Sequence, residues 1–106
     1  MISEERLEKA LVYLATTDQE AADLKVSYLR QEYAADLARK RIFLLSEGNN
    51  EERKAKAETS AEVQERQTDY FGAIEAYERV KAKRATEELI VEVFRTLEAS
   101  RRQGRI

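Results

Sequence analysis

Apolar residues near the N-terminus recur at helical spacing. They fall at intervals of three and four, which places them on one face of a helix. The set is Leu7, Ala10, Leu11 and Leu14. Ser3 precedes them and is a residue type that commonly caps a helix N-terminus. The pattern predicts a first short helix over residues 3–15.

The next stretch contains a signal for a new helix start. Thr17 is followed three residues later by Glu20. This is the spacing of a capping box, in which the two side chains accept hydrogen bonds from otherwise unpaired backbone N–H groups. We therefore expect the chain to break at Thr16 and Thr17 and a second helix to occupy residues 18–47.

This second predicted helix has two apolar rows. The first steps alternately by three and four, as in a coiled coil, and includes one polar residue. Its members are Ala21, Leu24, Tyr28, Gln31, Ala35, Ala38, Ile42 and Leu45. A second stripe consists of Ala22, Val26, Leu29, Tyr33 and Leu37. We interpret this second stripe as lying beside the first row, which makes the apolar face wider than a two-stranded coiled coil needs. We expect this helix to contact more than one neighbour.

A turn and two further helices follow. Gly48 and the two asparagines after it are typical of a left-handed helix end. Asn50 is suited to cap a short charged helix over residues 50–58, and Thr59 with Glu62 forms a capping box for a last helix over residues 60–102.

The last helix has its own apolar face. Val63, Tyr70, Ile74 and Tyr77 share one side of it. Gly72 lies within the same helix, where glycine costs about 1 kcal/mol relative to alanine, so we interpret it as the mark of a close helix crossing.

Together these elements predict an all-α fold. Residues 1–106 form a single domain, an elongated, coiled-coil-like antiparallel helical hairpin with short N-terminal and elbow helices. At a rise of 1.5 Å per residue, folding back at the elbow pairs residues whose numbers sum to roughly 108, which places Leu24 opposite the region of Arg84. The pattern allows the hairpin to close within one chain or to be exchanged between chains.

The segment from Leu89 to Leu97 predicts self-association. It is apolar on several faces, more than one short helix can cover, so we expect a homo-oligomer, with a dimer favoured. The candidate interface residues are Leu89, Ile90, Val93, Phe94 and Leu97.

Composition narrows the function classes. The chain is 42% hydrophobic, which argues against disorder, and 38% charged, which suits exposed helical faces. It has no histidine or cysteine, and its neighbouring acids point in different directions on a helix. We predict no catalytic, metal-binding or cofactor-binding residues and no enzymatic activity. Because the pattern contains no signal peptide or membrane span, we expect a cytoplasmic protein.

The near balance of 19 basic and 21 acidic residues argues against bulk nucleic-acid binding, but basic residues cluster at the C-terminus. Arg101, Arg102 and Arg105 lack interspersed acids and are the candidate contact for a phosphate backbone. Other basic clusters, at 39–41 and 81–84, alternate with acids and are interpreted as solvated faces. The tyrosines on the predicted rows are interpreted as packing residues rather than platforms for unpaired bases.

Three segments resemble small helical proteins of tailed bacteriophages and prophages. They are Tyr33–Gly48, Arg53–Glu58 and Tyr77–Arg84. The most concrete analogues are recombination mediators of the UvsY type. The resemblance implies a small helical oligomer that helps load a recombinase onto single-stranded DNA, with a phage recombination or replication protein as partner. The alternative is a structural or assembly adaptor of a phage particle that does not bind nucleic acid.

Overall fold

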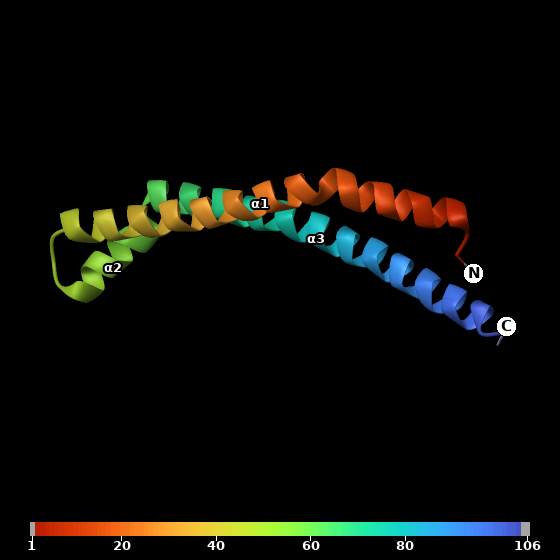
Figure 1. Ribbon diagram of the computed structural model, residues 1–106. Helices are drawn as coiled ribbons and strands as arrows, with labels where there is room; N and C mark the ends of the chain where they lie inside the picture. Colours follow the sequence, from red (N-terminus) through yellow and green to blue (C-terminus); the bar gives the residue numbers. More distant parts are fainter. Residues whose placement is uncertain (1, 105–106) are drawn as a thin grey trace. The chain divides into compact units, whose positions relative to one another are not determined.

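Every regular element in the described part of the chain is α-helical. The computed structural model describes residues 2–104 and contains α1 (Glu4–Leu45), α2 (Asn50–Thr59) and α3 (Ala61–Arg102) (Figure 1). The all-α prediction is confirmed. The described N-terminus also begins as expected, because the Ser3 hydroxyl accepts a 3.0 Å hydrogen bond from the backbone N–H of Arg6.

The chain divides into two compact units. The elbow unit is Asp23–Tyr77, and the terminal unit is Met1–Ala22 together with Glu78–Ile106. Both long helices contribute a segment to each unit, and each unit is described by itself below.

The elbow unit is an antiparallel helical hairpin. Tyr28 and Tyr77 pack with their ring centroids 5.2 Å apart. Further along the pair, Tyr70 donates a 2.7 Å hydrogen bond to Glu32. Because positions on α3 fall as positions on α1 rise, the two segments run in opposite directions. The predicted hairpin is confirmed, and Tyr28 and Tyr77 are packing residues.

The predicted break at Thr16 and Thr17 is wrong, since α1 is continuous from Glu4 to Leu45. The Thr16 hydroxyl donates to the carbonyl of Val12 at 2.9 Å, and the Thr17 hydroxyl donates to the carbonyl of Tyr13 at 2.7 Å. Both threonines therefore bond back to the preceding turn, as they do inside a helix, instead of capping a new one.

The turn after α1 follows from one glycine. Gly48 has φ of +113°, a conformation that favours glycine, and its predicted left-handed role is confirmed. The ends of the helices differ slightly from the predicted ones. Asn49, not Asn50, caps α2 by accepting a hydrogen bond from the N–H of Glu52. Ser60, not Thr59, caps α3 by accepting one from the N–H of Val63.

Cations of α2 complete the C-terminal end of α1. The last turn of α1 contains no basic residue. Instead the Arg53 side chain donates a 3.0 Å hydrogen bond to the carbonyl of Phe43 and lies over its ring, 4.3 Å from the centroid. Lys56 donates to the carbonyl of Glu47 just beyond the helix. Positive charge at this position is favourable, because the unpaired carbonyls give a helix C-terminus a partial negative charge.

Two local expectations in the elbow unit are wrong. A Cβ added at Gly72 meets no atom within 4 Å, so this glycine does not mark a close helix crossing. Leu45, the last member of the predicted row, is also the last residue of α1 and is 78% exposed, so it does not belong to the covered inner face.

Candidate protein-interaction surface

The inner face of α1 is the predicted coiled-coil row. In the elbow unit, the members of this row that are buried or half-buried include Leu24, Tyr28, Ala35, Ala38 and Ile42. The same alternation of threes and fours continues toward the N-terminus through Ala10, Leu14, Thr17 and Ala21, which are also buried or half-buried. This unbroken row is the signal that α1 is continuous, and it outweighs the capping-box spacing at Thr17.

The second stripe of α1 lies on the opposite side of the helix. Val26 follows Leu24 by two residues, and Tyr33 follows Gln31 by two, which is a rotation of about 200°. The expectation that this stripe lies beside the first row and widens the inner face is therefore wrong. Its four large residues are between 45% and 69% exposed: Val26, Leu29, Tyr33 and Leu37. We call these four the outer stripe.

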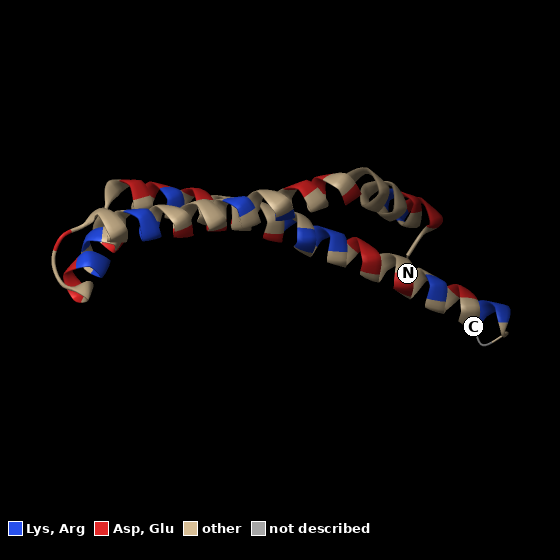
Figure 2. Ribbon diagram, turned by 60° about the vertical axis from the view of Figure 1, so that its left-hand side comes forward, with Lys and Arg blue, Asp and Glu red and all other residues tan. Residues whose placement is uncertain are grey.

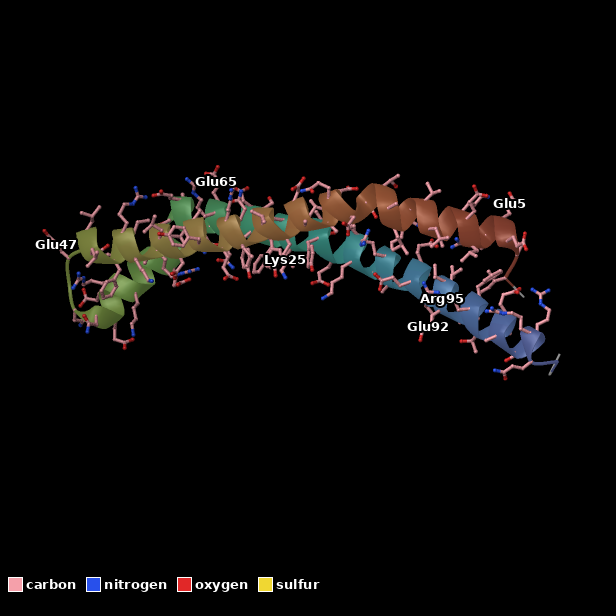
Figure 3. The ribbon with its side chains drawn as sticks, viewed as in Figure 1. Glu5, Lys25, Glu47, Glu65, Glu92 and Arg95 are labelled. Carbon is pink, nitrogen blue, oxygen red and sulfur yellow. The ribbon has the colours of Figure 1, made fainter. Side chains whose placement is uncertain are left out.

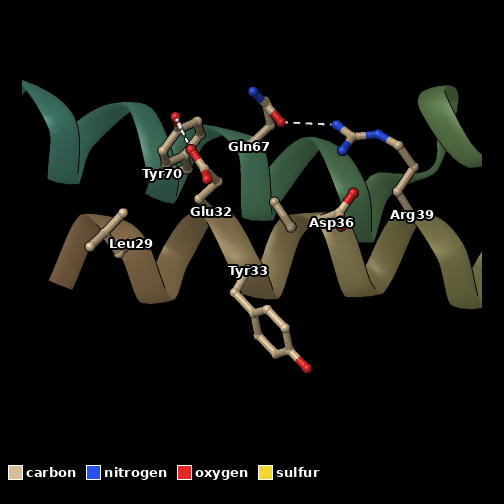
Figure 4. Close-up of a pocket in the computed structure, with 8 residues that line it drawn as sticks. Leu29, Glu32, Tyr33, Asp36, Arg39, Gln67 and Tyr70 are labelled. Atoms are coloured by element: carbon tan, nitrogen blue, oxygen red, sulfur yellow. Dashed lines mark hydrogen bonds between the residues drawn. The ribbon is translucent and has the colours of Figure 1, made fainter. Parts of the chain in front are cut away.

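Figure 4 shows Leu29 and Tyr33, two residues of the outer stripe, beside a hollow of the elbow unit. The ring of Tyr33 extends from α1 on the side away from α3. The hollow has a volume of about 540 Å³ and is lined in part by Leu29, Tyr33 and the carboxylates of Glu32 and Asp36. The hydrogen bond from Tyr70 to Glu32 crosses it and raises the pKa of Tyr70, because ionisation would remove the donated proton.

The terminal unit has a polar contact at its inner face. The guanidinium of Arg84 donates to the Thr17 hydroxyl at 2.7 Å and to the Leu14 carbonyl at 2.8 Å. It also pairs with Asp18 at 3.2 Å. Arg84 therefore contacts α1 at residues 14–18 within the terminal unit.

A buried carboxylate lies one turn further along α3. Glu87 is 4% exposed, and Arg6 donates to it at 2.8 Å while Lys83 approaches at 3.4 Å. The hydrogen bond from Arg6 is the largest cause of a lowered pKa for Glu87, and it outweighs the effect of burial. Lys83 also lies 4.8 Å from the ring centroid of Tyr13. The Glu87 carboxylate is therefore held by two cations of its own unit, which indicates a structural contact.

The predicted oligomer interface is divided between two faces. Val91 is buried and Ile90, Phe94 and Leu97 are partly covered by the terminal unit itself. Leu89 and Val93 are 59% and 38% exposed and lie four residues apart, hence on one side of α3. Figure 3 shows the neighbouring exposed side chains Glu92 and Arg95 on the same helix. Of the five predicted interface residues, Leu89 and Val93 are therefore the two that are exposed to another molecule.

The two described arginines of the predicted nucleic-acid contact are exposed, but one of them is ion-paired. Arg101 forms an ion pair with Glu98, so the expectation that the cluster has no acidic partner is wrong. Arg102 is exposed and forms no ion pair among residues 2–104. Arg105 lies outside the described residues.

The other basic residues are mostly matched by acids. In the cluster at 39–41, Arg39 pairs with Glu58, Lys40 with Asp36, and Arg41 with Glu62. Figure 2 shows both signs of charge along α2. This part of the elbow unit is therefore not a continuous positive groove of the kind that follows a phosphate backbone.

Searches for other kinds of site and for known relatives gave no match. No group of three or more potential metal ligands occurs among residues 2–104, and none of the described helices has a stretch apolar enough to span a bilayer. Protein-family models, curated proteins and solved structures likewise yielded no match to this chain.

Proposed function

We propose that this chain is a nonenzymatic accessory protein that acts through contacts with other proteins, including its own copies. The observation that carries the proposal is the outer stripe. Four large apolar residues follow one another on the side of α1 opposite its inner row, where a helix that packs on one neighbour normally carries polar residues. Covering such a surface with another protein removes apolar area from water.

Within this class we place the chain among accessory or mediator proteins of phage-type DNA recombination or replication. The resemblance of Tyr33–Gly48 and the two later segments to small phage proteins supports this placement. The alternative is a structural or assembly adaptor of a phage particle. The two functions differ in whether the protein must contact single-stranded DNA.

Self-association is tested by sedimentation equilibrium at micromolar concentration. We expect a concentration-dependent mass of about twice that of the 12.3 kDa chain, because two exposed apolar surfaces are available for contact. Leu89→Asp tests the predicted interface on α3 without disturbing the covered face of that helix. A chain that stays monomeric at every concentration contradicts the proposal of a homo-oligomer.

A DNA role is tested by titrating labelled single-stranded DNA at several salt concentrations. Exposed Arg102 is the observation that favours such a contact. Replacing Arg101, Arg102 and Arg105 with alanine should weaken binding and flatten its salt dependence, since phosphate contacts release counterions. The matched control replaces Arg39, Lys40 and Arg41, which are already ion-paired. No binding by the wild type at low salt favours the adaptor alternative.

A further inference from the structure

We propose that the outer stripe is the docking surface for α1 of a second copy of this chain, arranged antiparallel. The inference rests on the proposed function and adds to it the partner, the direction and the register. The contact joins Val26 of one copy to Leu37 of the other, and Leu29 to Tyr33.

The apolar residues of the outer stripe are self-complementary in one antiparallel register. When two identical helices run in opposite directions about a two-fold axis level with residue 31, positions whose numbers sum to 62 come level. Position 29 then comes level with 33, and position 26 comes within one residue, about 1.5 Å along the helix, of position 37. A two-fold axis makes each contact occur twice, once in each direction. Each of the four large residues then has an apolar residue of the second copy at its own level or within about 1.5 Å of it along the helix.

The charges beside the stripe favour the same register. Lys25 is exposed and forms no ion pair within the described residues, and Figure 3 labels its position on α1. Asp36 lies 11 residues away, about 16 Å along the helix, so the two cannot meet within one copy. In the antiparallel register, Lys25 comes within one residue, about 1.5 Å along the helix, of Asp36 of the second copy, again twice by symmetry.

The hollow beside Tyr33 offers negative charge to Lys25 of the second copy. Its lining includes the carboxylates of Glu32 and Asp36, with Leu29 and Tyr33 on the side of the stripe (Figure 4). Asp36 already attracts Lys40 at 3.0 Å on its own helix, which leaves one carboxylate oxygen for a second cation. A parallel arrangement would instead place Lys25 level with its own counterpart, far from this hollow.

Cysteine cross-linking tests the direction, because the natural chain contains no cysteine. Leu29→Cys and Tyr33→Cys are made as separate proteins, mixed, equilibrated and oxidised. We expect the mixture to form a disulfide-linked dimer of one chain of each kind, with much less product from either variant alone. Products from each variant alone, without the mixed one, would show a parallel pair and overturn the proposal. Glu65→Cys, on the exposed surface of α3, is the control and should not cross-link to either.

Charge exchange tests the register. Lys25→Asp and Asp36→Lys should each weaken self-association by roughly tenfold, because each replaces two attractive pairs by two repulsive ones. The double variant should recover most of the loss, since the exchanged charges again meet across the contact. Recovery cannot result from damage to the fold. Two single variants with unchanged association, or a double variant weaker than both, would overturn the proposed register.

Sedimentation of Tyr33→Asp separates this inference from the proposed function. Tyr33 points away from α3, so the hairpin should keep its helix content by circular dichroism while the dimer dissociates. If the wild type is monomeric, the proposed self-association and this inference both fail. If the wild type is oligomeric and Tyr33→Asp leaves its mass unchanged, the docking surface is wrong while self-association stands.

Discussion

The buried side chains of the elbow unit are apolar, whereas those of the terminal unit include a threonine and a glutamate. Ala35, Ala38, Ala57 and Val63 are buried in the elbow unit. In the terminal unit the buried residues include Thr17 and Glu87 as well as Ala10 and Val91. Apolar contacts have no direction and barely respond to pH, whereas the hydrogen bonds of Thr17 and Glu87 are directional and depend on charge. The two units should therefore respond differently to the same perturbation.

The largest effect is expected from a charge in the elbow core. Val63 is fully buried, so Val63→Asp places a carboxylate where the apolar contacts offer it no partner. We expect a loss of roughly 3–5 kcal/mol in the free energy of unfolding, measured by urea denaturation. Ala61→Asp is the control, because residue 61 is exposed in the first turn of α3, where negative charge is favourable. Equal stability of the two variants would contradict an apolar elbow core.

Acid should destabilise the terminal unit first. The pKa of Glu87 lies below its ordinary value of 4.5 because Arg6 hydrogen-bonds to the ionised form. The stabilisation is therefore present above pH 4.5 and is lost as the pH falls through the lowered pKa. Hydrogen exchange should show amides of the terminal unit losing protection in acid before those of the elbow unit.

Glu87→Gln sharpens this test. The variant should be less protected at neutral pH and should lose the difference between the units in acid, because it has no carboxylate to titrate. Glu88→Gln is the matched control, since Glu88 is exposed and should behave as the wild type. If both variants keep the wild-type response to acid, Glu87 is not its source.

Thr17 and Thr16 provide a finer comparison within the terminal unit. Thr17→Val removes the hydroxyl that accepts from Arg84 and should cost about 1.5 kcal/mol, because that hydrogen bond involves a charged donor. Thr16→Val alters an exposed residue with the same change in side-chain shape, so helix propensity cancels between the two. Thermal denaturation of both variants measures the difference. Equal stabilities would show that the Arg84 contact contributes little.

The hairpin could be predicted because its signals are local. Gly48 supplies the left-handed turn, and the heptad row supplies the inner face of α1. The continuity of α1 was missed because a threonine followed by a glutamate three residues later occurs both at helix starts and inside helices. What decides between them is whether the apolar row keeps its phase, and here it does, from Leu7 to Ile42.

The candidate surface was less predictable than the fold. The sequence identifies Val26, Leu29, Tyr33 and Leu37 as a stripe, and their rotation from the inner row follows from spacing alone. Whether another part of the chain covers them depends on tertiary packing, and the spacing of residues along the sequence does not determine that packing. The ion pair between Arg101 and Glu98 could be predicted from the sequence, because residues three apart are neighbours on a helix.

The smallest effects are expected at two glycines of the elbow unit, with opposite signs. Gly72 lies in an exposed helix interior with open space around its Cα, so Gly72→Ala should stabilise the protein by about 1 kcal/mol through helix propensity alone. Gly48→Ala should destabilise it, because φ is +113° and the new Cβ would lie 2.7 Å from the carboxylate of Glu52. Urea denaturation of both variants measures the two shifts. If Gly72→Ala instead destabilises the chain, the space beside it is filled in solution. Within the described residues of one chain, no atom lies near a Cβ added at Gly72. The atoms that fill the space would then belong to another copy or to a partner packed against α3. The contacts of the elbow unit would in that case extend beyond its own hairpin.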